Sequence, residues 1–320
     1  FHIPTKENLT SSFMNIVLLI SAERGRRCLE SLYQCITDND QVTVFTFLEK
    51  PWEPLYVDDI NRLANLYNSQ VYVTSKVNEP SYSQFWESEI DVIIAVGWRY
   101  LLPSKIYNTA SLGCFVFHDS YLPKNRGFSP TVWSIRNGER NTGVSVFKIT
   151  ERVDEGPIIF QEEVSIFDDD YISEVMEKVT IRCESLIKKL YQSIKTNTIS
   201  LNNQNHNDAS YLCKLVPNDF QIDWNKTSKE IFDLIRSYSY PYPGAFTFFQ
   251  NKKLYLYSAS VESIPFDSEY IEGKVNYFND DGSATVFCGN STAIKLIDIS
   301  TDGKTIIKPK NFIKIGDKLE

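Results

Sequence analysis

The sequence predicts an α/β protein with a mostly parallel sheet in its N-terminal part and a small antiparallel β-barrel in its C-terminal part. Three observations lead to this fold class. Short, apolar, β-branched runs alternate with amphipathic stretches over the first part of the chain, which is typical of βαβ units and of a sheet covered on both faces. A segment rich in Asn and Ser interrupts this pattern at 196–210. Short strands separated by Gly, Asn and Asp follow it, as in small barrels.

The order of the first elements is that of a Rossmann-like, doubly wound sheet. The predicted strands are 15–20, 41–47, 70–73, 91–96 and 113–118, and the predicted helices between them include 24–36, 54–68 and 102–110. In such sheets, ligands bind beyond the carboxyl ends of the strands. The strand GCFVFH ends on His118, so this histidine is expected at that edge.

Two more strands and a long helix complete the first domain. The strands are expected at 142–149 and 156–166, and an acidic turn begins an amphipathic helix over 168–195. The Asn-rich stretch after the helix has too little apolar surface to order itself, which predicts an interdomain linker. We expect Met14 to be the natural first residue. The predicted units are a leader or tag remnant at 1–13, a first domain at 14–199, a linker at 200–210 and a second domain at 211–320.

The second domain begins with a helix and continues in strands. The helix, 227–239, opens with a Thr and Ser cap and has a Glu in its first turn. The predicted strands are 245–249, 253–259, 272–278, 283–288 and 293–299.

Composition and charge argue against several classes of function. The 320 residues include 33 Lys and Arg against 41 Asp and Glu, a formal net charge of -8, which argues against a nucleic acid as the main partner. The six cysteines form no CxxC pair, so we expect free thiols in a reducing cytoplasm and no metal site. No apolar run is long enough to span a bilayer, and the N-terminus does not resemble a signal peptide. We therefore expect a cytoplasmic protein without a membrane partner.

The candidate chemistry centres on His118 and Asp154. A histidine at the end of an apolar strand is partly desolvated, which favours the neutral imidazole that a general base requires. Asp154 follows 36 residues later in a polar turn before another apolar strand. If the two strands are neighbours, Asp154 can orient His118 or relay its proton. A structural alternative stays open, in which the histidine binds a backbone carbonyl and the aspartate only forms a turn.

Four motifs resemble those of a known family. FHDSYLPKNRGFSP at 117–130 is similar to the HxSxLPxxRGxxP signature of the folate-dependent formyltransferases, which include methionyl-tRNA formyltransferase and the nucleotide-sugar N-formyltransferases. AVGWRYLLP at 95–103 resembles the pterin-binding loop of that family, and 137–159 resembles its catalytic aspartate region. QIDWNKTSKEIF and the residues after it, up to 249, resemble the start of its C-terminal domain. The resemblance covers 14–260, and it implies a formyltransferase domain followed by an OB-like barrel.

The resemblance implies formyl transfer from 10-formyltetrahydrofolate to an amine, without a metal. His118 matches the histidine of the family, which acts on the proton of the attacking amine or on the oxyanion, and Asp154 matches its partner acid. The cofactor-binding residues that it implies are Val96, Gly97, Trp98, Leu102 and Ser120. Main-chain groups can read the dense donor and acceptor pattern of a pterin edge.

Candidate substrate contacts lie after the histidine. Arg126, Phe128 and Trp133 are the predicted substrate-binding residues, because a cation suits a diphosphate and aromatic rings can stack on a base or a sugar. For Arg126 and Ser120 a role in shaping the loop beside the site is the alternative. For the two aromatic side chains, the alternative is a place in the core.

One position departs from the family pattern. Its members carry an asparagine two residues before the histidine, and the amide of this asparagine donates to the developing oxyanion. This chain has Val116 there. Loss of one such donor typically costs about 10²–10³ in rate. Either another donor replaces the amide, or the chain is a catalytically silent protein that binds folate or a nucleotide.

The predicted acceptor is a nucleotide-linked aminosugar of the dTDP-4-amino-4,6-dideoxysugar type. Members of the family that act on tRNA resemble one another in a long basic insertion after the second strand. The corresponding segment here, 48–63, has more acids than bases. Methionyl-tRNA formyltransferase remains the alternative within the family. By resemblance to the sugar N-formyltransferases, we expect a homodimer.

Overall fold

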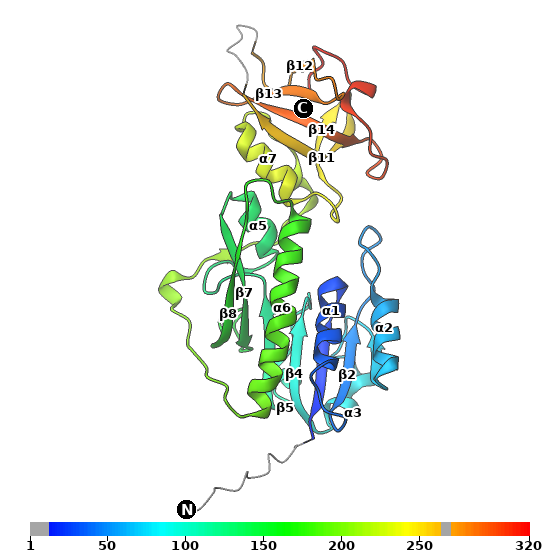
Figure 1. Cartoon of the computed structure of the whole chain (residues 1–320), viewed down its shortest axis with the longest axis vertical. Coiled ribbons are helices and arrows are strands. Elements are labelled where there is room, and N and C mark those ends of the chain that lie inside the picture. Colours follow the sequence, from blue (N-terminus) through cyan, green and yellow to red (C-terminus); the bar gives the residue numbers. More distant parts are fainter. Residues whose placement is uncertain (1–12, 264–269) are drawn as a thin grey trace, which may run out of the picture.

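The computed structural model describes residues 13–263 and 270–320. The predicted leader therefore lies outside the described residues, apart from Phe13. Two parts follow one another along the long axis of the molecule (Figure 1). The N-terminal part holds a large sheet with helices around it, and the C-terminal part holds a smaller sheet with one helix, α7, between the two parts.

The described N-terminal residues form a seven-stranded sheet in the order β3-β2-β1-β4-β5-β7-β8. The strands from β3 to β5 are parallel, whereas β7 is antiparallel to β5 and β8 to β7. The predicted mostly parallel sheet is thus confirmed, with an antiparallel edge. The strands are β1 (Asn15–Ile20), β2 (Gln41–Thr46), β3 (Gln70–Val73), β4 (Ile90–Val96), β5 (Ala110–His118), β7 (Asn141–Lys148) and β8 (Ile158–Ser165).

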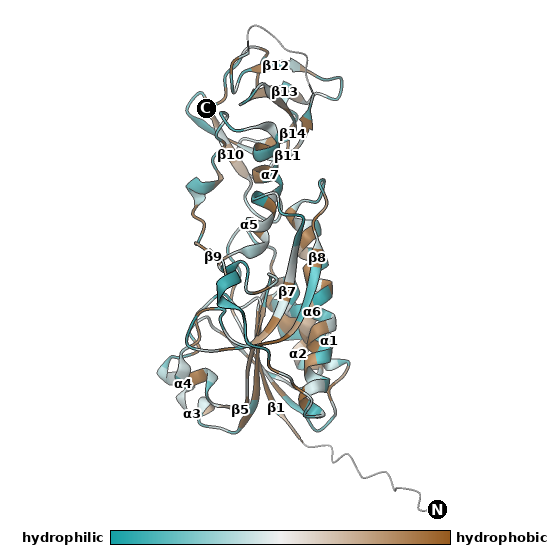
Figure 2. Cartoon of the chain, turned by 90° about the vertical axis from the view of Figure 1, so that its left-hand side faces the viewer, coloured by the Kyte–Doolittle hydropathy of each residue, from teal (hydrophilic) through white to brown (hydrophobic). Residues whose placement is uncertain are grey.

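Helices cover both faces of this sheet. Alternate residues of a strand point to opposite sides, so a strand that is apolar throughout packs against helices on both faces. In β1, Ile16 and Leu18 pack in the apolar cluster under α1 and α6, whereas Val17 and Leu19 pack in the cluster under α3 and α4. Figure 2 shows brown along strands such as β1 and β5, more teal in the edge strand β8, and helices with both brown and teal residues. The helices are α1 (Ala22–Tyr33), α2 (Val57–Leu66), α3 (Ser83–Trp86), α4 (Ser104–Tyr107), α5 (Pro130–Arg136) and α6 (Ile172–Lys195).

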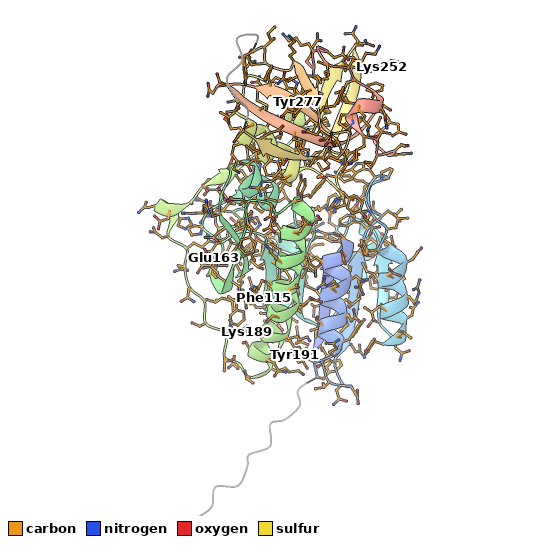
Figure 3. The ribbon with its side chains drawn as sticks, turned by 45° about the horizontal axis from the view of Figure 1, so that its top comes forward. Phe115, Glu163, Lys189, Tyr191, Lys252 and Tyr277 are labelled. Carbon is orange, nitrogen blue, oxygen red and sulfur yellow. The ribbon has the colours of Figure 1, made fainter. Side chains whose placement is uncertain are left out.

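The long predicted helix is α6, and its buried side chains run along one face. Tyr191 of α6 and Phe115 of β5, both labelled in Figure 3, belong to the same apolar cluster. The hydroxyl of Tyr191 donates to Asp40 over 2.6 Å, and Lys195 forms a 2.7 Å ion pair with that carboxylate. These contacts fasten the end of α6 to the loop before β2.

The C-terminal strands form an antiparallel barrel. In the described residues their order is β10-β11-β14-β13-β12, and residues 317–320 bridge the two edges. The main chain of Glu320 exchanges two 2.8 Å hydrogen bonds with Phe248 of β10, and Leu319 donates to Gly273 before β12. The elements are α7 (Ser228–Ser237), β10 (Ala245–Phe249), β11 (Lys252–Glu262), β12 (Val275–Phe278), β13 (Ala284–Cys288) and β14 (Thr292–Ser300).

One apolar cluster joins the two parts. Val132 and Ile135 of α5 and Ile172 of α6 lie in the same cluster as Ile231 and Ile235 of α7. At the start of α7, the hydroxyl of the predicted cap, Thr227, accepts from the backbone N–H of Glu230, and the backbone N–H and hydroxyl of Thr227 donate to the Glu230 carboxylate.

The Asn-rich stretch is ordered by polar contacts, so the expectation that it could not order itself is wrong. Asn202 exchanges two 2.8 Å backbone hydrogen bonds with Ile158 of β8. Gln204 is buried. Further on, β9 (Tyr211–Leu212) pairs with β6 (Arg126–Gly127). Hydrogen bonds from Asn, Gln and Ser side chains, and not apolar burial, keep this segment ordered.

Candidate active site

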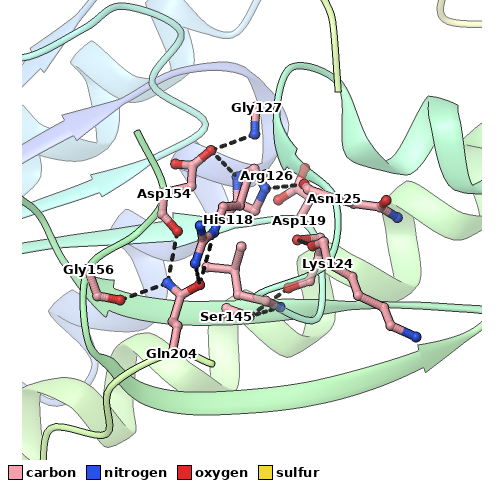
Figure 4. Close-up of polar contacts among 12 residues, drawn as sticks. His118, Asp119, Lys124, Asn125, Arg126, Gly127, Ser145, Asp154, Gly156 and Gln204 are labelled. Atoms are coloured by element: carbon pink, nitrogen blue, oxygen red, sulfur yellow. Dashed lines mark hydrogen bonds and ion pairs between the residues drawn. The ribbon is translucent and has the colours of Figure 1, made fainter. Parts of the chain in front are cut away.

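His118 and Asp154 meet at the carboxyl end of β5. The Nδ1 atom of His118 lies 3.7 Å from Oδ2 of Asp154, and both side chains are nearly buried. In the sheet β5 lies between β4 and β7, so the histidine stands where the parallel strands end. The neighbouring strand β7 leads into the turn that carries Asp154. The spatial meeting of the two positions, which the sequence could only assume, is present in the fold (Figure 4).

The other ring nitrogen of His118 faces a backbone carbonyl. Nε2 lies 2.8 Å from the carbonyl oxygen of Asn125, and a carbonyl oxygen only accepts, so this contact requires a proton on Nε2. Asn125 has a φ of 60°. Its backbone N–H donates to the Ser210 hydroxyl over 2.8 Å, and its amide donates to Glu139 over 3.1 Å. The ring nitrogen nearer to Asp154 is therefore the one left to exchange a proton.

The carboxylate of Asp154 is anchored from the loop after His118. The backbone N–H of Gly127 donates to Oδ2 of Asp154 over 2.7 Å. Asp154 itself has a φ of 55°, in the left-handed region, where a non-glycine residue needs support from its surroundings. Its carbonyl accepts a 2.8 Å hydrogen bond from the side-chain amide of Gln204.

The predicted pterin-binding residues lie on the adjacent strand end. Val96 of β4 pairs with Phe117 of β5. Gly97 has a φ of 68°, and its carbonyl accepts a 2.6 Å hydrogen bond from the Ser21 hydroxyl. The indole Nε1 of Trp98 is buried without a hydrogen-bond partner among the residues that the structure describes. Leu102 is partly buried against the same apolar cluster.

An unpartnered buried N–H is rare and costs about 1–3 kcal/mol. A ligand acceptor beside Trp98 would satisfy this N–H. The indole ring is itself held in place, since it makes edge contacts with Phe47 and Tyr100 at centroid distances of 5.3 Å and 5.8 Å. The orphaned indole N–H thus fits the acceptor groups of a pterin.

Of the other predicted contacts, Ser120 and Arg126 are buried, whereas Phe128 is exposed. Ser120 is buried, and its hydroxyl donates to the carbonyl of Lys124. Arg126 has no exposed surface, and its nitrogens bind Gln204 and the Tyr211 hydroxyl. A direct ligand contact with these Arg126 donors would have to replace one within the protein, whereas the Ser120 hydroxyl has used only its donor. Phe128 is 47% exposed.

Trp133 and Tyr242 also have neighbours in the fold. The indole N–H of Trp133 donates to the carbonyl of Cys213. Tyr242, from the loop before β10, lies 5.8 Å from the ring of Trp52 in the first part. Burial raises the pKa of Tyr242 above its ordinary value. This contact brings the second part against the loop after β2, on the side where the parallel strands end.

Sequence reasoning missed three residues that hold the histidine and aspartate. Asn125 lies inside the quoted motif, but only its backbone carbonyl contacts His118, and a backbone contact leaves no signal in residue type. Ser210 and Gln204 lie in the segment interpreted as an unstructured linker. In composition that segment resembles an ordinary loop, so nothing in it marked these two residues.

In 13–263 and 270–320, no group of three or more His, Cys, Asp or Glu side chains is arranged to hold a metal ion. Within the same residues, no helix combines the length and the apolar character that crossing a membrane requires. All six cysteines, each of them described, are free thiols, and four are buried.

Comparison with known families gives two matches that together span most of the chain. Residues 14–189 match the family described as formyl transferase, and residues 214–316 match the formyl transferase C-terminal domain.

Solved structures with similar folds include three of different kinds. An N-formyltransferase from Helicobacter canadensis, in complex with folinic acid and dTDP-3-aminofucose, is 18% identical, with a TM-score of 0.65 over 89% of this chain and 99% of that one. HypX from Aquifex aeolicus is 17% identical, with a TM-score of 0.65 over 95% of this chain and 49% of that one. Methionyl-tRNA formyltransferase from Clostridium thermocellum is 20% identical, with a TM-score of 0.56 over 81% and 100%. At these identities, the likeness concerns the fold.

Proposed function

This chain belongs to the formyl transferase family, and from that premise we propose that it transfers a formyl group from 10-formyltetrahydrofolate to the amino group of a nucleotide-linked aminosugar. The observation that carries the proposal is the pair formed by His118 and Asp154, 3.7 Å apart, beside the strand end that holds Val96 and Gly97. A base next to a site for a one-carbon donor is what amine formylation requires.

In the proposed reaction, the amine nitrogen attacks the formyl carbon and forms a tetrahedral oxyanion. The bond from that carbon to N10 of the folate then breaks, leaving the formamide and tetrahydrofolate. Nδ1 of His118 takes the proton that the amine loses and returns it to N10. Asp154 stabilises the imidazolium that forms in between, because its Oδ2 lies 3.7 Å from Nδ1. Protons and electrons balance without a further reactant.

Two features support folate as the formyl donor. The unpartnered indole N–H of Trp98 calls for an acceptor, and the pterin ring offers several. The left-handed turn at Gly97 brings main chain to the surface at the strand end, where a planar ligand can be read by backbone groups. The related N-formyltransferase structure contains folinic acid.

Charge and shape support a nucleotide sugar as the acceptor. The loop after β2, which would carry a basic insertion in a tRNA-binding relative, is short, and Glu53 in it pairs with Arg99 over 2.7 Å. The net charge of -8 disfavours a polyanion. The exposed rings of Trp52 and Phe128 are available to a base or a sugar. A homodimer stays a prediction.

A catalytically silent binding protein is the second candidate, and Val116 favours it. This side chain packs against apolar clusters and offers no donor to an oxyanion. For a working enzyme that uses another donor, we expect Val116→Asn to change kcat less than about tenfold. A gain on the order of 10²–10³ would show that the donor is missing.

The decisive assay mixes the purified protein with 10-formyltetrahydrofolate and a panel of dTDP- and UDP-linked aminosugars. Mass spectrometry would detect a product 28 Da heavier than the substrate, the mass that replacement of an N–H hydrogen by a formyl group adds, with stoichiometric release of tetrahydrofolate. Formylation of charged tRNA without turnover of any sugar would overturn the proposed acceptor. No turnover with any amine, together with retained folate or nucleotide binding, would support the silent protein.

A further inference from the structure

Gln204, in the segment predicted to be a linker, is buried and makes four side-chain hydrogen bonds. It is 6% exposed, and its side-chain amide donates to the carbonyls of Asp154 and Gly156 over 2.8 Å and 2.7 Å. Its Oε1 accepts from Nε and Nη2 of Arg126 over 3.1 Å and 2.7 Å. Both donors and both acceptor positions of the side chain are therefore used.

These contacts reach both sides of the Asp154 anchor. On one side, Gln204 holds the backbone of Asp154 itself. On the other, it holds Arg126, and the next residue, Gly127, donates its backbone N–H to the Asp154 carboxylate over 2.7 Å. Figure 4 shows the contacts of Gln204 with Asp154 and Gly156 and the contact of Gly127 with the Asp154 carboxylate.

The local backbone needs such a tie. Asp154 has a φ of 55°, a conformation that costs a non-glycine residue free energy and persists only when the surroundings determine it. Asp154 and Gly156 lie on either side of Glu155 in the chain, and the side-chain amide of Gln204 binds both of their carbonyls. Loss of those two hydrogen bonds would let the turn relax and carry the carboxylate away from His118.

We propose that Gln204 is a positioning residue for formyl transfer, which holds the Asp154 carboxylate at its distance from His118. This inference rests on the proposed function, because it assigns Gln204 to the same reaction. Gln204 contacts neither His118 nor the reacting atoms in the proposed scheme. Its effect passes through the backbone of Asp154.

Gln204→Glu is the sharpest variant. A glutamate has the same size and keeps an oxygen, now charged, for the guanidinium of Arg126. It loses both N–H donors and places a carboxylate oxygen against the carbonyls of Asp154 and Gly156, so the tie to these two residues is replaced by repulsion while the contact with Arg126 is kept. Gln204→Met, which cuts both ties, is the second variant in case the first does not fold. Gln192, exposed on α6, supplies the matched control, Gln192→Glu.

We expect kcat of Gln204→Glu to fall on the order of 10²-fold, with KM for the folate within about threefold, since a misplaced catalytic group acts on the chemical step. In an Asp154→Asn background, the same change should cost less than about threefold, because Gln204 then has no catalytic carboxylate to position. An equal loss in both backgrounds, or a loss no greater than that of Gln192→Glu, would overturn the proposal.

A spectroscopic test does not depend on turnover. The chain has three histidines, so the ring ¹⁵N signals of His118 can be assigned by comparison with His118→Ala. We expect Gln204→Glu to move these signals toward those of Asp154→Asn. Signals unchanged from the wild type would overturn the role of Gln204 even if formylation is found. Moved signals in a protein that formylates no amine would instead refute the proposed function and keep the tie between Gln204 and Asp154.

Discussion

Gly127→Ala perturbs both the fold and the candidate site at one atom. Gly127 lies in β6 with a φ of 104°, and its N–H donates to the carboxylate of Asp154. A Cβ atom at this position would lie 2.5 Å from the carbonyl oxygen of Leu212 in the paired strand β9. Backbone oxygen cannot move aside without breaking the pairing of β6 with β9, so the variant must strain the backbone or separate the strands.

The expected cost has two contributions. An alanine at this φ costs about 1–3 kcal/mol in backbone strain, and an overlapping atom in a packed region costs about 1–3 kcal/mol more. We therefore expect the free energy of unfolding to fall by about 2–6 kcal/mol. The N–H of residue 127 also shifts away from Asp154, so kcat should fall in the protein that remains folded.

Gly316→Ala is the matched control. Gly316 has a φ of 89°, and a Cβ there would meet no atom within 4 Å. This variant carries the strain without the overlap, and should lose about 1–3 kcal/mol. Urea unfolding followed by circular dichroism measures both variants. If Gly127→Ala is no less stable than Gly316→Ala, the close approach of β9 does not constrain this turn and the reasoning is wrong.

Three further predictions concern other parts of the molecule. His118→Ala should lower formyl transfer on the order of 10²–10⁴-fold and leave nucleotide affinity, measured by calorimetry, largely intact; an unchanged rate would remove His118 from the mechanism. Arg236→Met should lower the free energy of unfolding in urea by about 1–3 kcal/mol, because buried Arg236 donates to the carbonyl of Asp170 over 2.8 Å and to Asp233 over 2.7 Å, while Lys229 keeps its ion pair with Asp233; an unchanged free energy of unfolding would contradict this. Burial alone would raise the pKa of Asp40, but hydrogen bonds, first that from Lys195, outweigh it and lower this pKa. Since a lowered pKa gives stability that is lost as pH falls through it, the wild type should lose more stability than Asp40→Asn below about pH 4, and parallel acid unfolding curves would refute this.

Local patterns in the sequence predicted most of the fold. Apolar runs of strand length and the three- and four-residue spacing of the long helix are properties of neighbouring residues, so β1, β2, β4, β5 and α6 lie close to their predicted positions. The end of a strand is also a local feature, and it placed His118 at the carboxyl edge of the sheet. The family motifs predicted the order of the two domains, which the matches to both formyl transferase domains confirm.

The tertiary structure decided how the site is held together. The contacts of Gln204 with Arg126 and of Ser210 with Asn125 join residues 78 and 85 positions apart, and the path of the chain that creates them leaves no periodic signal. The same applies to the barrel, which Glu320 closes against Phe248.

What the sequence by itself determined is therefore the elements and the chemistry of the side chains at their ends. The spacing of apolar residues indicates which face of a helix or strand is buried, and this spacing is visible in any short segment of the sequence. The distance between His118 and Asp154, and the turning of Arg126 into the protein, depend on hydrogen bonds that form only once distant segments are packed together. Those polar contacts could be known only from the folded chain.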